Sequence, residues 1–333
     1  MSGHTSYIIF TVLSQMAVGA LIAMLIADFL AKSKEDAKFF ETGAWVCVPV
    51  VVVGLIAMLS HEARPFLAMM TMNNHLATSW LSREVLALTL FVILAVVYTA
   101  LWVCESEYGS LRGIISKIPV ISALIPALVK IFMPLRKIIG ILAAVLGFVV
   151  YLYASATSYM MYTMPAWNQP TTLVFFIVTT LLAGVTAVAA VLSVKYLMKK
   201  EAGKSFTTFL WAATGIAGVM VVVLAAAVYA NITMLPIAST EMAKMAQLAT
   251  LEDMLHGEHA TFLWLRVVIG IGLVLVCLVG LALALIKKSM STAAILAIAV
   301  FVFAFIGELL GRAVFFGSIV PLSEVMPHFL SIV

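Results

Sequence analysis

Long apolar stretches separated by short polar segments run along the whole chain. Eight of them lie at roughly 6–31, 43–61, 83–104, 138–162, 171–198, 206–235, 260–286 and 292–317. Each is close to or longer than the about 20 residues that a helix needs to cross a bilayer, and a helix satisfies its own backbone groups in lipid. The pattern therefore predicts an all-α integral membrane protein with eight transmembrane helices, folded as one membrane domain over residues 1–333.

The positions of the basic residues predict how these helices are oriented. Fourteen of the 19 lysines and arginines lie in the connections between the first and second, third and fourth, fifth and sixth, and seventh and eighth stretches. Because cytoplasmic connections of membrane proteins are rich in lysine and arginine, both termini are predicted on the periplasmic side of a bacterial inner membrane. The net charge of +4 adds little to this asymmetry.

Two further segments are apolar in part but are not predicted to span the membrane. Within 105–137, the apolar part 114–134 is interrupted by three prolines and two lysines, and 236–258 places methionines and leucines three apart between charged residues. Both patterns are typical of helices at a membrane surface. We expect 105–137 to be a proline-rich cytoplasmic interfacial segment and 236–258 to be a periplasmic amphipathic loop.

The composition excludes several classes of protein. Apolar residues make up 64% of the chain and charged residues 10%, whereas soluble domains carry about 25% charged residues. This composition argues against a soluble enzyme, a nucleic-acid-binding protein and a disordered scaffold. The three cysteines lie far apart without CxxC spacing, and no histidine lies at mid-membrane depth, where the axial ligands of a transmembrane haem would be. We therefore predict no haem or metal site in this chain.

The candidate chemistry lies at the predicted periplasmic ends of the helices. Ionisable residues inside a membrane cost about 2.5–3.5 kcal/mol each at the bilayer centre on insertion scales, and they are functional by default. Two proton-exchanging side chains, His61 and Glu84, end and begin consecutive stretches, and arginines lie nearby, which indicates a site of coupled proton and electron transfer. The further candidates at this depth are Gln15, Arg64, Trp167, Glu308 and Arg312.

Each candidate also has a purely structural interpretation. Glu308 and Arg312 lie four residues apart and can neutralise each other on one helix face. Trp167 is equally suited to be an aromatic anchor at the membrane interface, and His61 to be a tolerated interfacial histidine. Gly307 and Gly311, which lie on either side of Glu308, form a pattern of small residues that favours helix packing.

Several short motifs occur in the order found in one known family. They are 10–15, 58–61 with Pro65, 81–84, 163–167, 264–266 and 307–317. Together they resemble the membrane-anchor subunits of bacterial dimethyl-sulfoxide reductase, within the wider group of polysulfide- and nitrite-reductase type quinol-interacting integral membrane subunits. The chain departs from that family in its longer segments 105–137 and 236–258.

The resemblance implies a haem-free anchor for anaerobic respiration that oxidises menaquinol near the periplasmic surface. Its partners would be an iron–sulfur subunit with 4Fe–4S clusters and a molybdopterin catalytic subunit, both on the periplasmic face, so the catalytic centre of the complex lies outside this chain. The functional histidine and glutamate of the family match His61 and Glu84. From their position alone, we expect Gln15, Arg64, Trp167, Glu308 and Arg312 to bind the quinol. Two alternatives stay open, an anchor that reduces quinone for a periplasmic dehydrogenase and, with less support, a secondary transporter.

Overall fold

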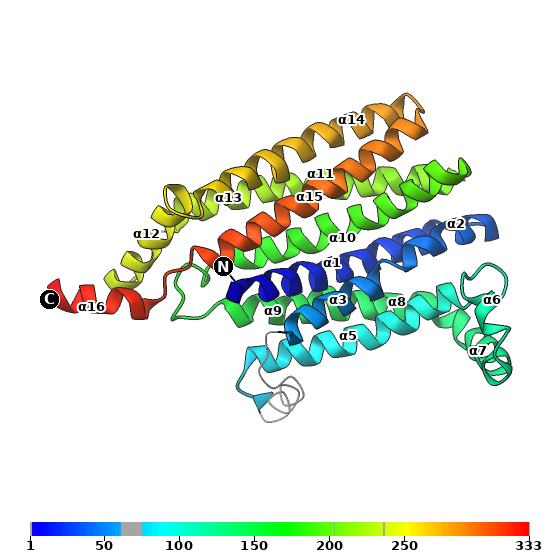
Figure 1. Ribbon diagram of the computed structural model, residues 1–333, viewed down its shortest axis with the longest axis horizontal. Coiled ribbons are helices and arrows are strands. Elements are labelled where there is room, and N and C mark those ends of the chain that lie inside the picture. The colour runs from blue at the N-terminus through cyan, green and yellow to red at the C-terminus, as the bar shows by residue number, and fades with distance from the viewer. Residues whose placement is uncertain (1, 61–74, 203, 236, 333) are drawn as a thin grey trace.

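The computed structural model describes residues 2–60, 75–202, 204–235 and 237–332, and this part of the chain is helical and contains no strand (Figure 1). Eight segments of the described chain are long and apolar enough to cross a membrane, which confirms the predicted number. The protein is therefore built as a multi-pass membrane protein.

Four of the eight segments are single uninterrupted helices or nearly so. These four helices are α1 (Ser2–Leu30), α5 (Trp80–Val103), α10 (Pro170–Lys199) and α11 (Lys204–Met234). In the eighth segment, a single helix, α15 (Met290–Gly317), forms most of the length. The others are composite. The second consists of α2 (Lys34–Ala44) and α3 (Cys47–Leu59). The fourth runs from Pro119 to Tyr159 and ends with α8 (Arg136–Val145), η2 (Leu146–Tyr151) and α9 (Leu152–Tyr159). The seventh consists of α13 (Ala260–Leu265), η3 (Arg266–Leu273) and α14 (Val274–Ile286).

Helices α1 and α10 form the centre of the bundle. In the most apolar part of each helix, 72% of the residues of α1 and 78% of those of α10 are buried. In the other six segments this share is 33–44%. Their backbones touch where Gly19 faces Gly184, since a Cβ added to Gly184 would overlap the Cα of Gly19. In a membrane, small residues at such crossings provide the close packing that holds helices together.

Substitution of Gly184 by alanine is expected to destabilise the bundle by about 1–3 kcal/mol, because the added methyl group has no room against backbone atoms. Gly218 of α11 is the matched control, since a Cβ there meets nothing within 4 Å. We expect Gly218→Ala to leave the stability unchanged or raise it by up to about 1 kcal/mol through helix propensity. Unfolding in detergent, followed by circular dichroism, measures both changes. Equal effects would contradict a tight α1–α10 contact.

The first connection differs from its predicted form. Residues 34–42, expected as loop, belong to the amphipathic helix α2, which continues to Ala44. The Ser33 side chain caps it by accepting a hydrogen bond from the Asp36 amide, and Glu35 and Asp36 in the first turn suit the positive end of the helix dipole. The helix buries Phe39 and Phe40 against the bundle.

Two π-helical segments, η2 and η3, interrupt the fourth and seventh spans. A π-helical turn inserts an extra residue into a helix and is frequent at functional sites. In this protein η2 ends at Tyr151 and η3 begins at Arg266, and both residues belong to the polar region described below.

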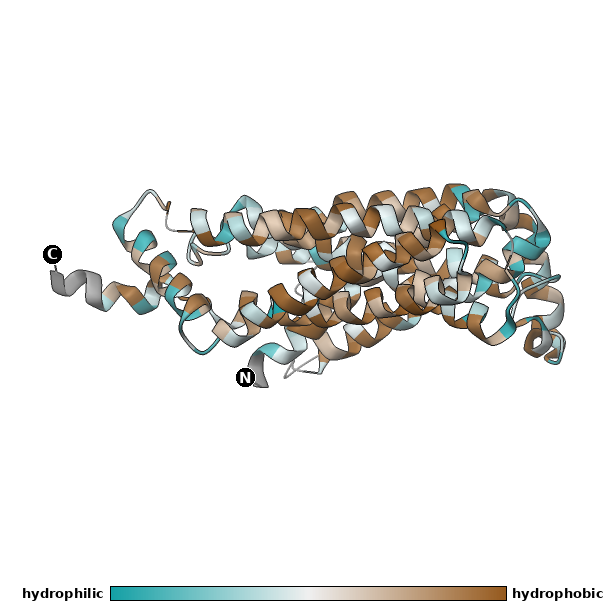
Figure 2. Cartoon of the chain, turned by 90° about the horizontal axis from the view of Figure 1, so that it is seen from above, coloured by the Kyte–Doolittle hydropathy of each residue, from teal (hydrophilic) through white to brown (hydrophobic). Residues whose placement is uncertain are grey.

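The two ends of the bundle carry different elements (Figure 1). The end that holds the N-terminus, called here the terminal end, also carries α12 (Glu241–Leu255) and α16 (Leu322–Ile332), which pack together through two alanines of α12 and Leu322 and Val325 of α16. The opposite end, called here the lysine-rich end, carries α2, α6 (Arg112–Ile115), α7 (Pro119–Phe132) and the short turn η1 (Met133–Leu135). Figure 2 shows a hydrophobic body between two more hydrophilic ends. Segment 105–137 thus contains two short helices and segment 236–258 contains α12, while their positions relative to a membrane stay predictions.

Candidate functional site

A buried carboxylate, Glu84, lies near the start of α5 and is held by two serines of α9. Its side chain is 1% exposed, and its oxygens accept hydrogen bonds from the hydroxyls of Ser155 at 2.7 Å and Ser158 at 2.8 Å. We call Glu84, Ser155 and Ser158 the glutamate–serine group. Both oxygens thus accept from neutral hydroxyls, and no hydrogen bond from an arginine to Glu84 occurs among the described residues.

A second set of buried polar side chains lies between α1, α10 and α15. We call Gln15, Thr179, Glu308 and Arg312 the arginine group. The Nη2 atom of Arg312 donates to Oε1 of Gln15 at 2.6 Å, and the hydroxyl of Thr179 donates to Oε2 of Glu308 at 2.7 Å. Arg312 Nη2 also lies 3.4 Å from the Thr179 oxygen, so this hydroxyl connects the two charged side chains. The expected interaction of Glu308 with Arg312 is thus indirect.

Helix α1 connects the two groups through consecutive residues. The hydroxyl of Ser14 lies 2.7 Å from that of Tyr151, at the end of η2 and one turn before Ser155. The next residue, Gln15, belongs to the arginine group. Both side chains are fully buried, so a displacement of α1 would move both groups together.

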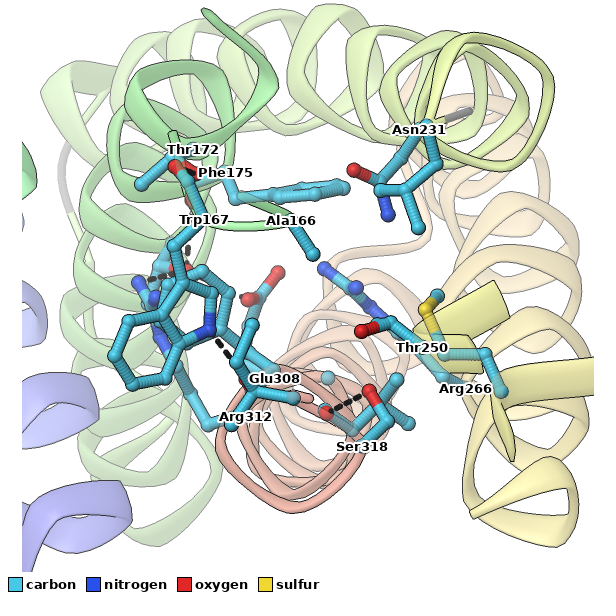
Figure 3. A pocket seen from close by; sticks show the side chains of 17 residues that line it. Ala166, Trp167, Thr172, Phe175, Asn231, Thr250, Arg266, Glu308, Arg312 and Ser318 are labelled. Carbon is cyan, nitrogen blue, oxygen red and sulfur yellow. Dashed lines mark hydrogen bonds between the residues drawn. The ribbon is translucent and has the colours of Figure 1, made fainter. Parts of the chain in front are cut away.

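A cavity lies beside the arginine group and is lined by residues of α10, α11, α12, η3, α15 and the 160–169 connection (Figure 3). Its polar lining consists of Trp167, Thr172, Thr179, Asn231, Thr250, Arg266, Glu308, Arg312 and Ser318. The free space in it is about 40 Å³. A cavity that is polar and of this size holds water rather than staying empty.

Four buried polar atoms of the cavity region have no hydrogen-bond partner among the described residues. They are Nε2 of Gln15, Nε of Arg266, Oε1 of Glu308 and Nε of Arg312. Six such atoms occur in the described chain, so most of them gather at this one place. Each unpaired buried polar group costs about 1–3 kcal/mol. Three of these four atoms, on Arg266, Glu308 and Arg312, belong to residues that line the cavity, so polar atoms inside the cavity would find unpaired partners there.

Arg266 was not among the predicted site residues, although the sequence placed it at the start of the seventh span. Its side chain is 5% exposed and its guanidinium lies 4.8 Å from the ring centre of Phe175. Gly311 makes room for it, since a Cβ there would lie 2.5 Å from the Arg266 guanidinium carbon. Gly311, which the sequence predicted to favour helix packing, thus packs against the side chain of Arg266. The signal that identifies Arg266 is the one that identified Arg312, an arginine within an apolar span.

An aromatic cluster lies against the arginine group and includes Tyr159 of α9. Trp167 stacks on Phe315 at 5.1 Å and donates its Nε1 hydrogen to the Phe315 carbonyl at 2.7 Å. Tyr159, which follows Ser158 on α9, makes edge contacts with both rings. The Arg312 guanidinium lies 4.0 Å from the ring centre of Phe176. Trp167 is thus half-buried against the protein and forms one wall of the cavity.

Not all predicted residues can be placed. His61 and Arg64 lie outside the described residues, so their roles stay predictions. The described chain reaches Ser60, whose hydroxyl is 3.5 Å from that of Ser6 in the first turns of α1. Glu84 and the arginine group lie in the half of the bundle that includes the terminal end. No group of three or more histidine, cysteine, aspartate or glutamate side chains suited to a metal ion occurs in the described ranges.

The chain is similar in sequence to subunits of two anaerobic dimethyl sulfoxide reductases. It is 30% identical over 185 residues to the anaerobic dimethyl sulfoxide reductase chain YnfH of Escherichia coli strain K12, a match that covers 56% of both proteins. It is 27% identical over 185 residues to a subunit of the anaerobic dimethyl sulfoxide reductase of Haemophilus influenzae, covering 56% of this protein and 57% of the relative. The aligned part thus spans little more than half the length of these relatives. The family profile described as DMSO reductase anchor subunit (DmsC) matches residues 2–118 and 106–318. The protein therefore belongs to the DMSO reductase anchor subunit family, as its motifs predicted.

Proposed function

We propose that this chain anchors a dimethyl-sulfoxide-reductase type complex in the bacterial inner membrane and oxidises menaquinol. In this proposal, both termini and the terminal end face the periplasm. An iron–sulfur subunit docks there, receives the electrons and passes them to a molybdopterin catalytic subunit. Family membership supports the role of anchor and favours it over a secondary transporter.

The observation that carries the proposal is the set of unpaired buried atoms around the cavity. Two guanidinium groups, Arg266 and Arg312, lie near one carboxylate, Glu308, so the region carries an excess of positive charge when Glu308 is ionised. Unbalanced charge is costly in a bilayer. A ligand with electron-rich oxygens offsets this cost, and a quinol develops negative charge on its ring oxygens as it loses protons.

The size of the cavity sets a condition on binding. Its free space of about 40 Å³ is far below the roughly 300 Å³ of the smallest usual ligand pockets. A quinol ring therefore fits in the cavity only when a wall side chain moves. Trp167 is suited to this movement, because it belongs to the 160–169 connection rather than to a helix.

Each of these residues has a separate role in the proposed oxidation of quinol. Quinol oxidation releases two protons and two electrons. Arg312 and Gln15 bind a ring oxygen, and Arg266 offsets the negative charge that develops on the head group. His61 and Glu84 receive the protons, since an imidazole and a carboxylate are the usual proton acceptors. Two electrons leave toward the partner at the terminal end.

Binding of a quinol analogue tests the arginine group directly. Arg312→Leu is expected to weaken binding by about tenfold to a hundredfold, because a hydrogen bond to a charged group contributes about 1.5–3 kcal/mol. The measurement is quenching of the analogue's fluorescence on membranes that contain the assembled complex. Arg112→Leu, a change of the same kind at the lysine-rich end, is the control and should bind normally. Unchanged binding by an inserted Arg312→Leu protein would refute the placement of quinol in this cavity.

A further inference from the structure

A large cavity opens at the lysine-rich end, between α2, the last turn of α10 and the first turn of α11. Its volume is about 910 Å³. Six lysines line it against three carboxylates, and the lysines are Lys32, Lys38, Lys195, Lys199, Lys200 and Lys204. The lining is therefore strongly positive, and the proposed quinol site makes no use of it.

The walls of this cavity are fixed by contacts between the helices. The ammonium of Lys195 donates to the carbonyl oxygens of Lys38 at 2.7 Å and Phe39 at 2.9 Å, and to the Thr42 hydroxyl at 2.6 Å. These bonds hold α2 against α10. On the other side, Phe39 packs on Phe206 of α11 at 4.8 Å. The backbone around the lysines is thus positioned before any ligand binds.

A second cavity adjoins the first and is more apolar. Lys38, Lys195 and Lys199 line both cavities. The second cavity continues along α10 past Val191, Val194 and Met198, and the last two are 45% and 79% exposed. A positive chamber therefore leads into an apolar groove on the outside of the bundle.

The position of the two cavities along the bundle matches the boundary of a membrane. Helix α10 ends at Lys199 and α11 begins at Lys204, so the lysines lie where two spans end and the apolar groove lies within the depth of the span. Lipid phosphates lie at the first depth and acyl chains at the second. Basic pockets between helices at this boundary bind anionic head groups.

We propose that these cavities bind an anionic phospholipid. Its phosphate lies between Lys38 and Lys199, and one acyl chain follows Val191, Val194 and Met198. A soluble phosphate compound would match the charge of the chamber but not the groove. A zwitterionic lipid would match the groove but would bring its amine among the lysines. The anionic phospholipid fits both and would bind whether or not quinol is the substrate of the chain.

The test is binding of phosphatidylglycerol to the purified full-length chain in an uncharged detergent, measured by native mass spectrometry. Each lysine near a membrane surface contributes about fivefold to the affinity for anionic lipid, so Lys38→Gln/Lys199→Gln is expected to bind about 25-fold more weakly. Lys287→Gln/Lys288→Gln is the matched control, because it removes two exposed lysines at the same end but outside both cavities. We expect it to bind within about twofold of the unmodified chain.

Three results would overturn the proposal. The first is an equal loss of binding in the control, which would mean general attraction to a basic surface. The second is equal binding of phosphatidylethanolamine, and the third is binding of inorganic pyrophosphate with the same affinity and lysine dependence. Circular dichroism without lipid verifies that the double variant is folded. If it is not, Lys199→Gln alone gives the result, with an expected loss of about fivefold.

Discussion

Replacement of Glu84 by glutamine is expected to lower quinol-dependent turnover by about 10²- to 10⁴-fold, the usual contribution of a general base. Glutamine keeps the size of the side chain and still accepts a hydrogen bond from Ser155 or Ser158, but it does not take up a proton. The assembled complex should reduce its substrate at the normal rate when an artificial donor supplies electrons to the partner subunits. The ratio of these two activities is the measurement.

Glu41 offers a matched control for this experiment. It is also a buried glutamate, 5% exposed, but it lies in α2 at the lysine-rich end and accepts a hydrogen bond from the Ser110 amide at 3.1 Å. Glu41→Gln should leave both activities unchanged, whereas His61→Ala should behave like Glu84→Gln. Normal quinol oxidation by Glu84→Gln would make the glutamate–serine group a structural feature. Loss of both activities would indicate failed assembly instead.

The second large effect is expected on stability at the lysine-rich end. Arg136 of α8 holds the buried carboxylate of Asp28 in α1 through two hydrogen bonds, from Nε to Oδ2 at 3.0 Å and from Nη2 to Oδ1 at 2.6 Å. The Tyr98 hydroxyl adds a third at 3.3 Å. In the Arg136→Met variant, the Asp28 carboxylate stays buried and keeps only the 3.3 Å hydrogen bond from Tyr98. Since removal of one member of a buried ion pair costs about 3–5 kcal/mol, we expect a loss of that size in the free energy of unfolding.

The double variant Asp28→Asn/Arg136→Met separates the charge from the packing. Replacement of a whole buried ion pair is often nearly neutral, so the second substitution should restore most of the stability that the first removes. Unfolding in detergent of the two single variants and the double variant completes the thermodynamic cycle. If the two losses are additive, the pair does not act as a unit.

Most of the fold was predictable because the bilayer imposes a length on every span. The eight apolar stretches became eight candidate spans within a few residues of most of their predicted ends. Three features were not predicted. Helix α2 is amphipathic and contains Lys34 and Lys38, which suggested a loop. In addition, α16 packs against α12, and the π-helical segments η2 and η3 interrupt spans that are continuous apolar runs in the sequence.

Which candidate residues lie together was predictable in part from polar residues within apolar spans, while their role stays a prediction. Gln15, Glu308 and Arg312 are brought together, and Trp167 forms a wall of the same cavity. Glu84 lies in the separate glutamate–serine group. The hydroxyl partners, such as Thr179, were not predictable, since threonines and serines in helices commonly bond to their own backbone and give no sign of a second partner. His61 and Arg64 stay predictions.

The unequal burial of the helices has a consequence for the route of the substrate. The α1–α10 pair is locked by its glycine contact, and α15 packs on α10, so that side of the cavity offers no passage. The opposite side is formed by α11 and the seventh span. In the most apolar part of each, only 33% of the residues are buried. We therefore expect quinol to arrive sideways from the lipid between these two elements, with its isoprenoid tail remaining in the bilayer while the head group reacts.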